Sequence, residues 1–327
     1  MKREHVVNCS FSNWYPLFKQ WTIKSEILKL PDSFIEYLLK DGVVLPAGGS
    51  NQNEHVEVGL NEDEVPDDWS DCEDESLEAP EFPSLQQNVE EAIEHLGGVV
   101  FPKLNWTSPR DASWISIDGT LRCKSFQDIC LLLKSSDFIA HDLTKAFEDC
   151  EDSTDSQPSS GFELVLRKWT EISPSTEFRC FVRRNELVAI SQRDTTNCYK
   201  FLLENEEAIH KEITKFYHMK ICSKFPESCF VFDVYRYADQ RIKLIDINPF
   251  SSVTDSLLFS WKELKDGLTD VQQSVDGRDG ELRMVTNHGS LQPSEFLSYR
   301  MPKDVIDVAS GEDINKLVDF LDFNKLT

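Results

Sequence analysis

The sequence lacks every cysteine pattern that would indicate a disulfide framework or a zinc site. Its nine cysteines are an odd number, no two of them stand in CxxC spacing, and no histidine pair lies near them. Disulfide scaffolds and zinc modules are recognised by such spacings. The composition therefore indicates neither class, and the chain must be stabilised by its apolar core.

Long apolar runs are also lacking. No stretch approaches the roughly 20 apolar residues that are needed to span a bilayer, and residues 1–11 do not contain the apolar core of a secretion signal. We therefore expect no membrane partner and a cytoplasmic location.

Positive charge is scarce, with 34 Lys and Arg against 58 Asp and Glu and a formal net charge of −24. Such a charge repels phosphate backbones, so we expect no direct nucleic-acid partner. Most of the excess is local, because residues 62–78 carry ten acids and residues 148–155 carry five, with no Lys or Arg in either run. Without those fifteen acids the charge is −9, so the remainder is only moderately acidic and can still contain a basic cleft.

The length of 327 residues and the 40% apolar content suffice for one large core or two coupled ones. Residues 47–80 are rich in Gly, Asn, Asp and Glu without an apolar period, which is typical of a solvated loop or linker. Alternatively, Trp69 among these acids forms a docking motif for a basic partner. The predicted divisions are an N-terminal structured segment (1–46), an acidic loop or linker (47–80), a first lobe (81–160) and a second lobe (161–327).

Caps and apolar spacing predict the helices. Ser84 with Gln87 forms a capping box for a helix that ends at Gly97-Gly98, and Ser125 with Asp128 forms another. Apolar spacing predicts a third helix over residues 209–221. A capping box predicts a fourth helix that begins at residue 310. Strands are expected over residues 99–101, 163–169, 177–182, 186–192, 230–236 and 242–247. Because several strands are joined by short turns, we predict an α+β fold with antiparallel pairing.

The strongest local signal is the run FVFDVYRYADQRIKLIDINPF, in which two β-branched segments flank a short polar turn. If Asp239 and Gln240 form a two-residue hairpin loop, Asp233 lies directly across from Asp246. Opposed Cβ atoms are about 5 Å apart, where two carboxylates repel by about 3 kcal/mol at an effective dielectric constant of about 20. Another group must therefore compensate the repulsion.

Asn248 lies two residues beyond Asp246 on the same strand face and adds a neutral oxygen to the pair. Two carboxylates and an amide oxygen suit Mg²⁺, which keeps waters and shares phosphate oxygens. Two alternatives stay open. Either the acids pair with Arg236 or Lys243, or a longer loop shifts the register and separates the carboxylates.

Two lysines stand at predicted strand ends. Lys103 ends GGVVFPK and precedes a loop over 104–113 that carries polar and cationic donors, and such a lysine can hold phosphate oxygens while the loop covers them. The alternative is an exposed strand terminus. Lys168 ends the next strand and is followed by Trp169 and, after a polar turn, by Glu177, which could accept hydrogen bonds from ribose hydroxyls. Arg193 and Asp194 are either phosphate-site groups or a surface salt bridge.

The order of these features resembles the ATP-grasp fold of carboxylate–amine ligases such as D-alanine–D-alanine ligase, with a lysine plus loop, a Lys-Trp followed by a Glu-Phe, an Asp, and an acid-x-Asn. The resemblance implies that Lys103 and Lys168 face phosphates, that residues 168–170 form the adenine hinge and that Glu177 accepts from ribose. It makes Asp233, Asp246 and Asn248 the Mg²⁺ ligands. The residues assigned to ATP are Lys103, Asn105, Trp106, Ser108, Arg110, Arg167, Lys168, Trp169, Thr170, Glu177, Arg179, Arg193 and Asp194.

Two departures from the ligase pattern bear on function. The covering loop NWTSPRDAS lacks the glycines that are usual in those ligases, so its closure can differ. Arg167 also replaces their acid before the lysine.

At a finer level the chain resembles the cell division cycle protein 123 family of eukaryotes nearly from end to end. The matching phrases include WYPLFKQWTIKS, GGVVFPKLNWTSPRDASWI, FELVLRKW, FVFDVYR, LIDINPFSSVTDSLLFSW and LSYRMPKDVIDVASGED. The family implies an ATP-grasp protein that assists assembly of the heterotrimeric translation initiation factor 2, binding its gamma subunit and promoting joining of alpha to gamma.

Three functional readings follow. We favour an ATP- and Mg²⁺-bound assembly chaperone, acting as a monomer on the gamma subunit as its client. The second reading is an ATP-grasp carboxylate–amine ligase or phosphotransferase, for which the sequence shows no second-substrate site. The third is a scaffold in which the nucleotide is only structural, so whether the chain is an enzyme stays open.

Overall fold

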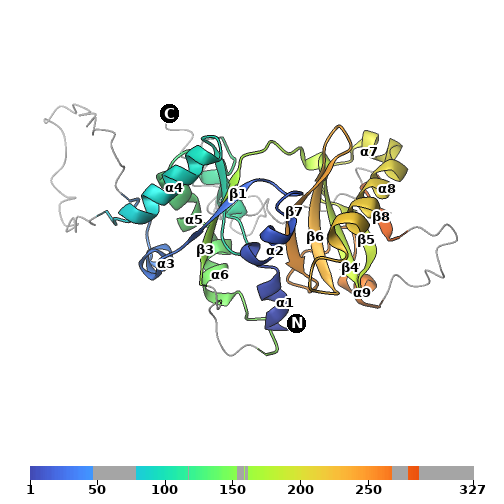
Figure 1. Ribbon diagram of the computed structural model, residues 1–327, viewed down its shortest axis with the longest axis horizontal. Helices are drawn as coiled ribbons and strands as arrows, with labels where there is room; N and C mark the ends of the chain where they lie inside the picture. The colour runs from blue at the N-terminus through green and yellow to red at the C-terminus, as the bar shows by residue number, and fades with distance from the viewer. Residues whose placement is uncertain (47–78, 117, 153–157, 159–160, 267–278, 287–327) are drawn as a thin grey trace, which may run out of the picture.

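The computed structural model describes residues 1–46, 79–116, 118–152, 158, 161–266 and 279–286. Two β-sheets lie side by side, each with its own covering helices (Figure 1). The helices are α1 (Arg3–Asn8), α2 (Phe11–Phe18), α3 (Asp32–Leu39), α4 (Pro83–His95), α5 (Phe126–Lys134), α6 (Asp137–Lys145), α7 (Lys200–Glu204), α8 (Glu206–Phe216) and α9 (Trp261–Asp266), with short helical turns η1 (Arg110–Ile115), η2 (Pro174–Thr176) and η3 (Tyr217–Ile221). Among the described residues, no helix is long and apolar enough to cross a membrane.

The smaller sheet has three antiparallel strands in the order β1-β3-β2, and the larger has five in the order β7-β6-β4-β5-β8. All pairs of the larger sheet are antiparallel except β5 with β8, which is parallel. The strands are β1 (Ser25–Lys29), β2 (Val100–Lys103), β3 (Glu163–Lys168), β4 (Glu177–Arg183), β5 (Glu186–Gln192), β6 (Phe230–Arg236), β7 (Ile242–Pro249) and β8 (Glu281–Arg283). The predicted α+β class and the arrangement of antiparallel and mixed sheets in two lobes are therefore confirmed. We call the two parts the small-sheet lobe and the large-sheet lobe.

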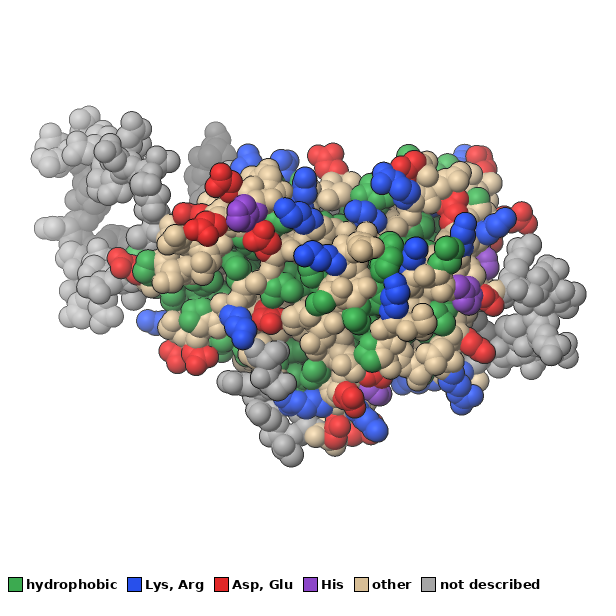
Figure 2. Space-filling model, in the orientation of Figure 1, with side chains coloured by type: hydrophobic (Ala, Val, Ile, Leu, Met, Phe, Trp, Pro, Cys, Tyr) green, Lys and Arg blue, Asp and Glu red, His purple; other side chains and the backbone are tan. Residues whose placement is uncertain are grey.

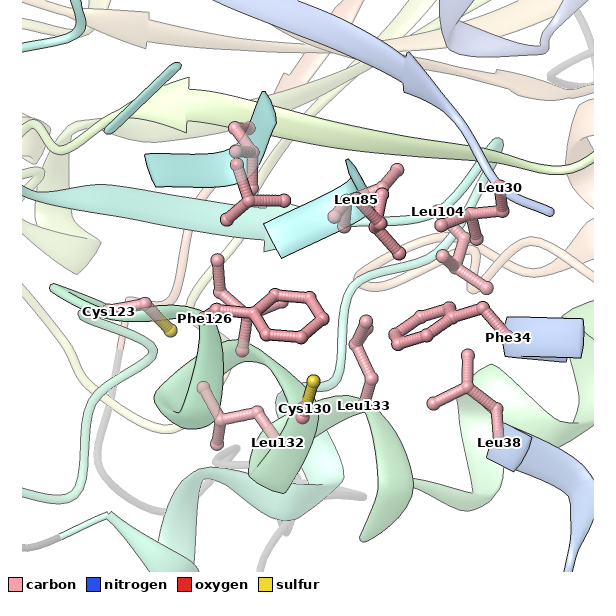
Figure 3. Packing of buried hydrophobic residues seen from close by; sticks show 14 of the residues in the cluster. Leu30, Phe34, Leu38, Leu85, Leu104, Cys123, Phe126, Cys130, Leu132 and Leu133 are labelled. Atoms are coloured by element: carbon pink, nitrogen blue, oxygen red, sulfur yellow. The ribbon is translucent and has the colours of Figure 1, made fainter. Parts of the chain in front are cut away.

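Each sheet is covered by its own apolar core. In the small-sheet lobe, Phe34 of α3 and Phe126 of α5 lie with ring centroids 6.0 Å apart, and Leu133 is buried in the same cluster (Figure 3). In the large-sheet lobe, side chains of α2, α8 and η3 cover β4, β6 and β7. The two lobes are thus packed units, so a ligand site between them is framed by rigid elements.

Strand β3 connects the two cores. Leu164 and Leu166 pack into the core of the small-sheet lobe, whereas Val165 packs into that of the large-sheet lobe. A strand that is buried on both faces needs apolar residues without alternation, which explains the run Leu-Val-Leu. The boundary predicted between the two lobes, at residues 160/161, places β3 in the second lobe. The hydrogen bonds of β3 instead place it in the smaller sheet, between β1 and β2.

The three predicted helices that lie within the described residues agree with the structure except at two ends. The capping box at Ser125 and Asp128 is present. The one predicted at Ser84 is wrong, because α4 begins at Pro83 and no side chain caps it. Proline suits the first helical position, where its missing N–H has no intrahelical partner. The regular part of the third helix ends at Phe216, and the chain continues as a π-turn. The helix predicted from residue 310 lies outside the described residues.

The β6–β7 turn is longer than predicted. The N–H of Tyr237 donates to the carbonyl of Arg241 (2.8 Å), and that of Gln240 donates to the carbonyl of Tyr237 (3.0 Å). The loop is therefore residues 238–240, not Asp239 and Gln240 alone. Gln240 has a φ of 67°, which is the left-handed conformation that closes a three-residue hairpin loop.

A bulge restores the register that the longer turn removes. Near the turn, Val234 pairs with Leu244, one residue out of the predicted register. The register then shifts between Asp233 and Val234, with Ile245 as the extra residue on β7, so that Asp233 pairs with Asp246. The predicted pairing is confirmed, although the predicted loop behind it is wrong.

Candidate functional site

A cleft of about 590 Å³ lies between the two lobes. The small-sheet lobe contributes the loop after β2 and Phe138 of α6, and the large-sheet lobe contributes strands β4, β6 and β7 and the segments after β5 and β7. The lining residues are Trp106, Thr107, Ser108, Arg110, Phe138, Arg179, Arg193, Asp233, Asp246, Asn248, Val253, Thr254 and Asp255. Eight of these were predicted as ATP or Mg²⁺ ligands, and they come from five separate parts of the sequence.

Asp233 is paired with an arginine on the neighbouring strand. Arg179 of β4 stands opposite Asp233 of β6, and its Nε and Nη2 donate to the two carboxylate oxygens, each at 2.8 Å. Both side chains are buried. Burial alone would raise the pKa of Asp233, but Arg179 and then Arg193 hold it well below its usual range. Asp233 is therefore an ionised carboxylate within the protein interior.

Asp246 is paired with a lysine from the other lobe. Lys103, at the end of β2, donates from Nζ to both oxygens of Asp246, at 2.9 and 2.8 Å. The lysine side chain is only 2% exposed, and burial lowers its pKa while the Asp246 carboxylate opposes that change. The predicted carboxylate repulsion is thus compensated from β4 and β2. Arg236 and Lys243, the alternative partners, instead contact Glu212 and the carbonyl of Thr22.

The cleft also contains guanidinium groups that its carboxylates do not fully neutralise. Arg193 lies 3.8 Å from Asp233 and 3.9 Å from Glu177, beyond hydrogen-bond distance. Burial and the charges of Arg179 and Arg110 lower the pKa of Arg193 to about 10. Arg110 forms no ion pair with another described residue, although it lines the same cleft. Such crowding of cations in one cleft favours an anionic ligand.

Two buried carboxylates hold the loop after β2. Asp142 of α6 accepts hydrogen bonds from the backbone N–H (2.8 Å) and the hydroxyl (2.7 Å) of Thr107. Conversely, Asp111 of the loop accepts hydrogen bonds from residues at the start of α6. The donors are the Ser136 hydroxyl at 2.6 Å and the backbone N–H of Phe138 at 3.2 Å. The loop and α6 are therefore connected by reciprocal contacts. This bracing is consistent with a covering loop without glycines.

Two predicted ATP residues make structural contacts away from the cleft. Asn105 is fully buried, accepts a hydrogen bond from the N–H of Glu163 and donates to the carbonyl of Gly161. Arg167 donates to the carbonyl of Ile245 at 2.8 Å and lies over the ring of Phe11. Neither lines the cleft, so in this arrangement both position the strands that frame it.

The predicted hinge lies at the end of β3. Lys168 is exposed, Trp169 is half-buried with the Arg122 guanidinium over its ring, and the Thr170 hydroxyl donates to the carbonyl of Lys168. The indole Nε1 of Trp169 is buried and has no hydrogen-bond partner among the described residues. An unpaired buried donor is costly, which makes it a group that a ligand or a small rearrangement would satisfy.

Glu177 and Asp194 have different environments. Burial raises the pKa of Glu177, while Arg193 acts in the opposite direction. Asp194 accepts hydrogen bonds from Thr196, Asn197 and Tyr199, which lower its pKa against the effect of burial. Asp194 thus orders the loop after β5, and Arg193 lies beside the buried Asp233 and beside Glu177 instead of forming a surface salt bridge.

Several lining residues were not predicted. Thr107, Phe138, Val253, Thr254 and Asp255 belong to the cleft, and Asp142 fixes its loop. The segment 250–255 directly follows the Asp-x-Asn run, which is a signal that it continues along the same wall. The sequence contains no equivalent signal for Phe138 or Asp142, because the position of α6 depends on tertiary packing.

The described side chains fit Mg²⁺ together with a phosphate-bearing ligand. No group of three or more His, Cys, Asp or Glu suited to a metal occurs in the described part of the chain, so a metal would need further ligands. Each ionised carboxylate can accept about four hydrogen bonds or metal contacts, and Asp233 and Asp246 each accept two here. The side chain of Asn248 makes no hydrogen bond with a described residue. Mg²⁺ commonly takes one or two carboxylates plus phosphate oxygens and waters.

Two sheets with a charged cleft between them define a two-lobed class of α+β protein. Within it, the chain belongs to the D123 family, whose model matches residues 14–309. It is 48% identical over 332 residues to the "Translation initiation factor eIF2 assembly protein" of Xenopus laevis, covering 99% of this chain and 97% of that protein. The Schizosaccharomyces pombe protein of the same name is 39% identical and covers 96% and 94% of the two chains.

The fold matches a solved structure of the same family. The structure of Cdc123 from Schizosaccharomyces pombe superimposes with a TM-score of 0.71 at 39% identity, and the match covers 88% of this chain and 99% of that one. The predicted family is therefore confirmed.

Proposed function

We propose that the cleft binds ATP with Mg²⁺ and that the chain is a cytoplasmic chaperone for assembly of translation initiation factor 2. The curated relatives named for assembly of this factor support the second part. The sequence resemblance adds the finer proposal that the client is the gamma subunit and that the chain aids its joining to alpha.

The observation that carries the nucleotide proposal is the set of cations around Asp233. Arg110 forms no ion pair with a described residue, and burial together with the charges of Arg179 and Arg110 lowers the pKa of Arg193 to about 10. A polyphosphate would accept hydrogen bonds from both and relieve their repulsion. Lys103 and Arg179, which are already paired, would hold the two carboxylates in place.

The metal residues have a defined role within this proposal. Asp233, Asp246 and Asn248 would hold Mg²⁺, which neutralises phosphate charge when bound. Without the metal, the same carboxylates would repel the phosphates. The chain's own contribution is therefore to fix two ionised carboxylates beside several guanidinium groups before the ligand arrives, so that little reorganisation is needed.

A ligase is the second candidate, and it rests on the same cleft. An acyl-phosphate mechanism needs a cationic site for a carboxylate substrate, and Arg110 or Arg193 has the charge to supply one. The same two groups are needed for the nucleotide, however, and the described cleft presents no further unpaired cation. We therefore favour the chaperone.

Comparing ATP binding in the wild type and in Asp246→Ala, in Mg²⁺ buffer and in EDTA, tests the nucleotide proposal. We expect a large loss of affinity in Mg²⁺. In EDTA we expect little loss, because removing Asp246 frees Lys103 and makes the cleft more positive. Asp239→Ala, in the exposed hairpin turn, is the control for a lost carboxylate. Equal weakening in both buffers would show that Asp246 is structural and contradict the metal assignment.

A further inference from the structure

Five lysines form a continuous basic band on the surface of this acidic chain. The segment between α2 and β1 supplies Lys19 and Lys24, the region around η3 supplies Lys220 and Lys224, and β7 supplies Lys243. None of the five lines the cleft, and none forms an ion pair with a described carboxylate. The band does not depend on the nucleotide proposal.

Contacts between the three segments show that the band is continuous. The ring of Trp21, in the same segment as Lys19 and Lys24, lies 3.7 Å from Nζ of Lys224 and 5.0 Å from Nζ of Lys220. The next residue, Thr22, accepts a hydrogen bond from Nζ of Lys243 at 3.4 Å. Two residues further, Nζ of Lys24 donates to the carbonyl of His95 at the end of α4. Lysine side chains thus follow residues 19–24, and blue side chains are gathered across the middle of the face in Figure 2.

Nearby acids do not neutralise this band, because they already have other partners. Glu26 lies beside His95 at 3.5 Å, Glu212 pairs with Arg236 and Asp239 pairs with Arg241. Five lysines side by side repel one another, and no described carboxylate lies within ion-pair distance of any of them. Their positive field is therefore available to an anionic partner.

We propose that the lysine band is a docking surface for an acidic polypeptide segment of a partner protein. Charge complementarity supports this occupant, since lysine ammonium groups are point charges that suit single carboxylates along an extended chain. Nucleic acid fits less well for two reasons. The tryptophan at the band, Trp21, has an ammonium group over its ring, so it offers no open stacking platform. A longer phosphate backbone would also extend into the negative field of the rest of the molecule.

Fluorescence anisotropy of a labelled peptide of ten glutamates, titrated with the full chain, tests the docking surface. We expect binding at about 0.05 M salt that weakens strongly at about 0.3 M, as screening shortens the range of the charges. The double substitution Lys220→Glu with Lys224→Glu should weaken binding about 5- to 30-fold, from two lost surface ion pairs with repulsion added. Lys220→Gln with Lys224→Gln should cause a smaller loss and guards against a folding defect.

The matched control is Lys262→Glu with Lys265→Glu on α9, where Lys265 likewise lies over a tryptophan, Trp261. This pair has the same charge change and should leave peptide binding nearly unchanged. Three results would overturn the proposal: no peptide binding at low salt, equal losses in both double variants, or tighter binding of a ten-nucleotide RNA. Zero-length crosslinks from Lys220 or Lys224 to acids within residues 62–78 of the same chain would also overturn it, by showing that the chain's own acidic run occupies the band.

Discussion

Asp233 and Asp246 are paired across β6 and β7, yet each carboxylate has a counter-charge of its own from a different element. Arg179 reaches Asp233 within the same sheet, whereas Lys103 reaches Asp246 from the other sheet. The second contact connects the two lobes at the cleft. A ligand that competes for Asp246 therefore acts on the lobe contact as well as on the carboxylate.

Asp233→Asn should destabilise the fold substantially. The substitution leaves the buried Arg179 guanidinium with a neutral partner, and breaking a buried ion pair from one side costs about 3–5 kcal/mol. Urea unfolding would measure the loss. Asp239→Asn removes a carboxylate from the exposed pair with Arg241 and should leave the free energy of unfolding nearly unchanged. Similar losses for both substitutions would show that the Asp233 pair adds nothing beyond a surface contact.

Asp142 should give a pH dependence of opposite sign to that of an ordinary paired carboxylate. Burial raises its pKa to about 6, although its bonds with Thr107 act in the opposite direction. Because the folded pKa is above the unfolded value of about 3.9, its contribution to stability is full below about pH 4 and is lost as the pH rises through about 6. Asp142→Asn cannot titrate. The free energy of unfolding of wild type minus variant should thus fall by roughly 3 kcal/mol between pH 4 and 7.

Chemical unfolding of the wild type and Asp142→Asn at several pH values checks this directly. The comparison removes the titration of all other groups, including Asp233, whose lowered pKa has the reverse effect. A difference that grows with pH would mean that the two Thr107 bonds outweigh burial and that Asp142 is ionised throughout the range.

The hairpin shows what the sequence could and could not provide. The alternation and the polar turn predict β6, β7 and the pairing of Asp233 with Asp246, because the side-chain period of a strand is fixed. The three-residue turn and the bulge at Ile245 were missed, since each shifts the register by one residue in opposite directions and neither has a clear local signal. The predicted pairing of Asp233 with Asp246 is nevertheless correct, because the two one-residue shifts cancel.

Only some of the residues that line the cleft could be predicted from the sequence. Residues next to a charged motif, such as Arg110 and Asn248, could be predicted because the chain places them beside it. Arg167 was assigned to the nucleotide through the resemblance to the ligases, but the structure buries it against Phe11 and the carbonyl of Ile245. Those contacts come from α2 and β7, which are far away in sequence, so no local pattern distinguishes a strand-end cation at a ligand from one that holds two elements together.

We predict that the purified chain hydrolyses ATP slowly or not at all with saturating Mg²⁺. Arg179 keeps the pKa of Asp233 well below its usual range, so this carboxylate is a weak base for activating a nucleophile. The cleft also shows no separate acceptor site among the described residues. Phosphate release over time is the measurement. Rapid turnover that requires a small carboxylic acid and an amine would favour the ligase over the chaperone.

The nucleotide and the client should bind cooperatively. The loop with Arg110 belongs to the small-sheet lobe, and Arg179 and Asp233 belong to the large-sheet lobe, so a ligand that contacts all three holds the lobes in one arrangement. It favours that arrangement only by its differential affinity for it. A coupling of about 1–3 kcal/mol, the usual range, would tighten binding of the proposed client, the gamma subunit of translation initiation factor 2, by roughly 5- to 150-fold.

Linkage requires the reciprocal effect, so the client must tighten ATP binding by the same factor. Calorimetry measures both effects. Client is titrated into the chain with and without Mg-ATP, and ATP is titrated into the chain with and without client. The variant Asp246→Ala separates the two sources of coupling. It frees Lys103 and so loosens the lobe contact, which should reduce client affinity even without nucleotide. Equal client affinities with and without Mg-ATP would reject the coupling and leave ATP with a structural role, whatever the effect of the substitution.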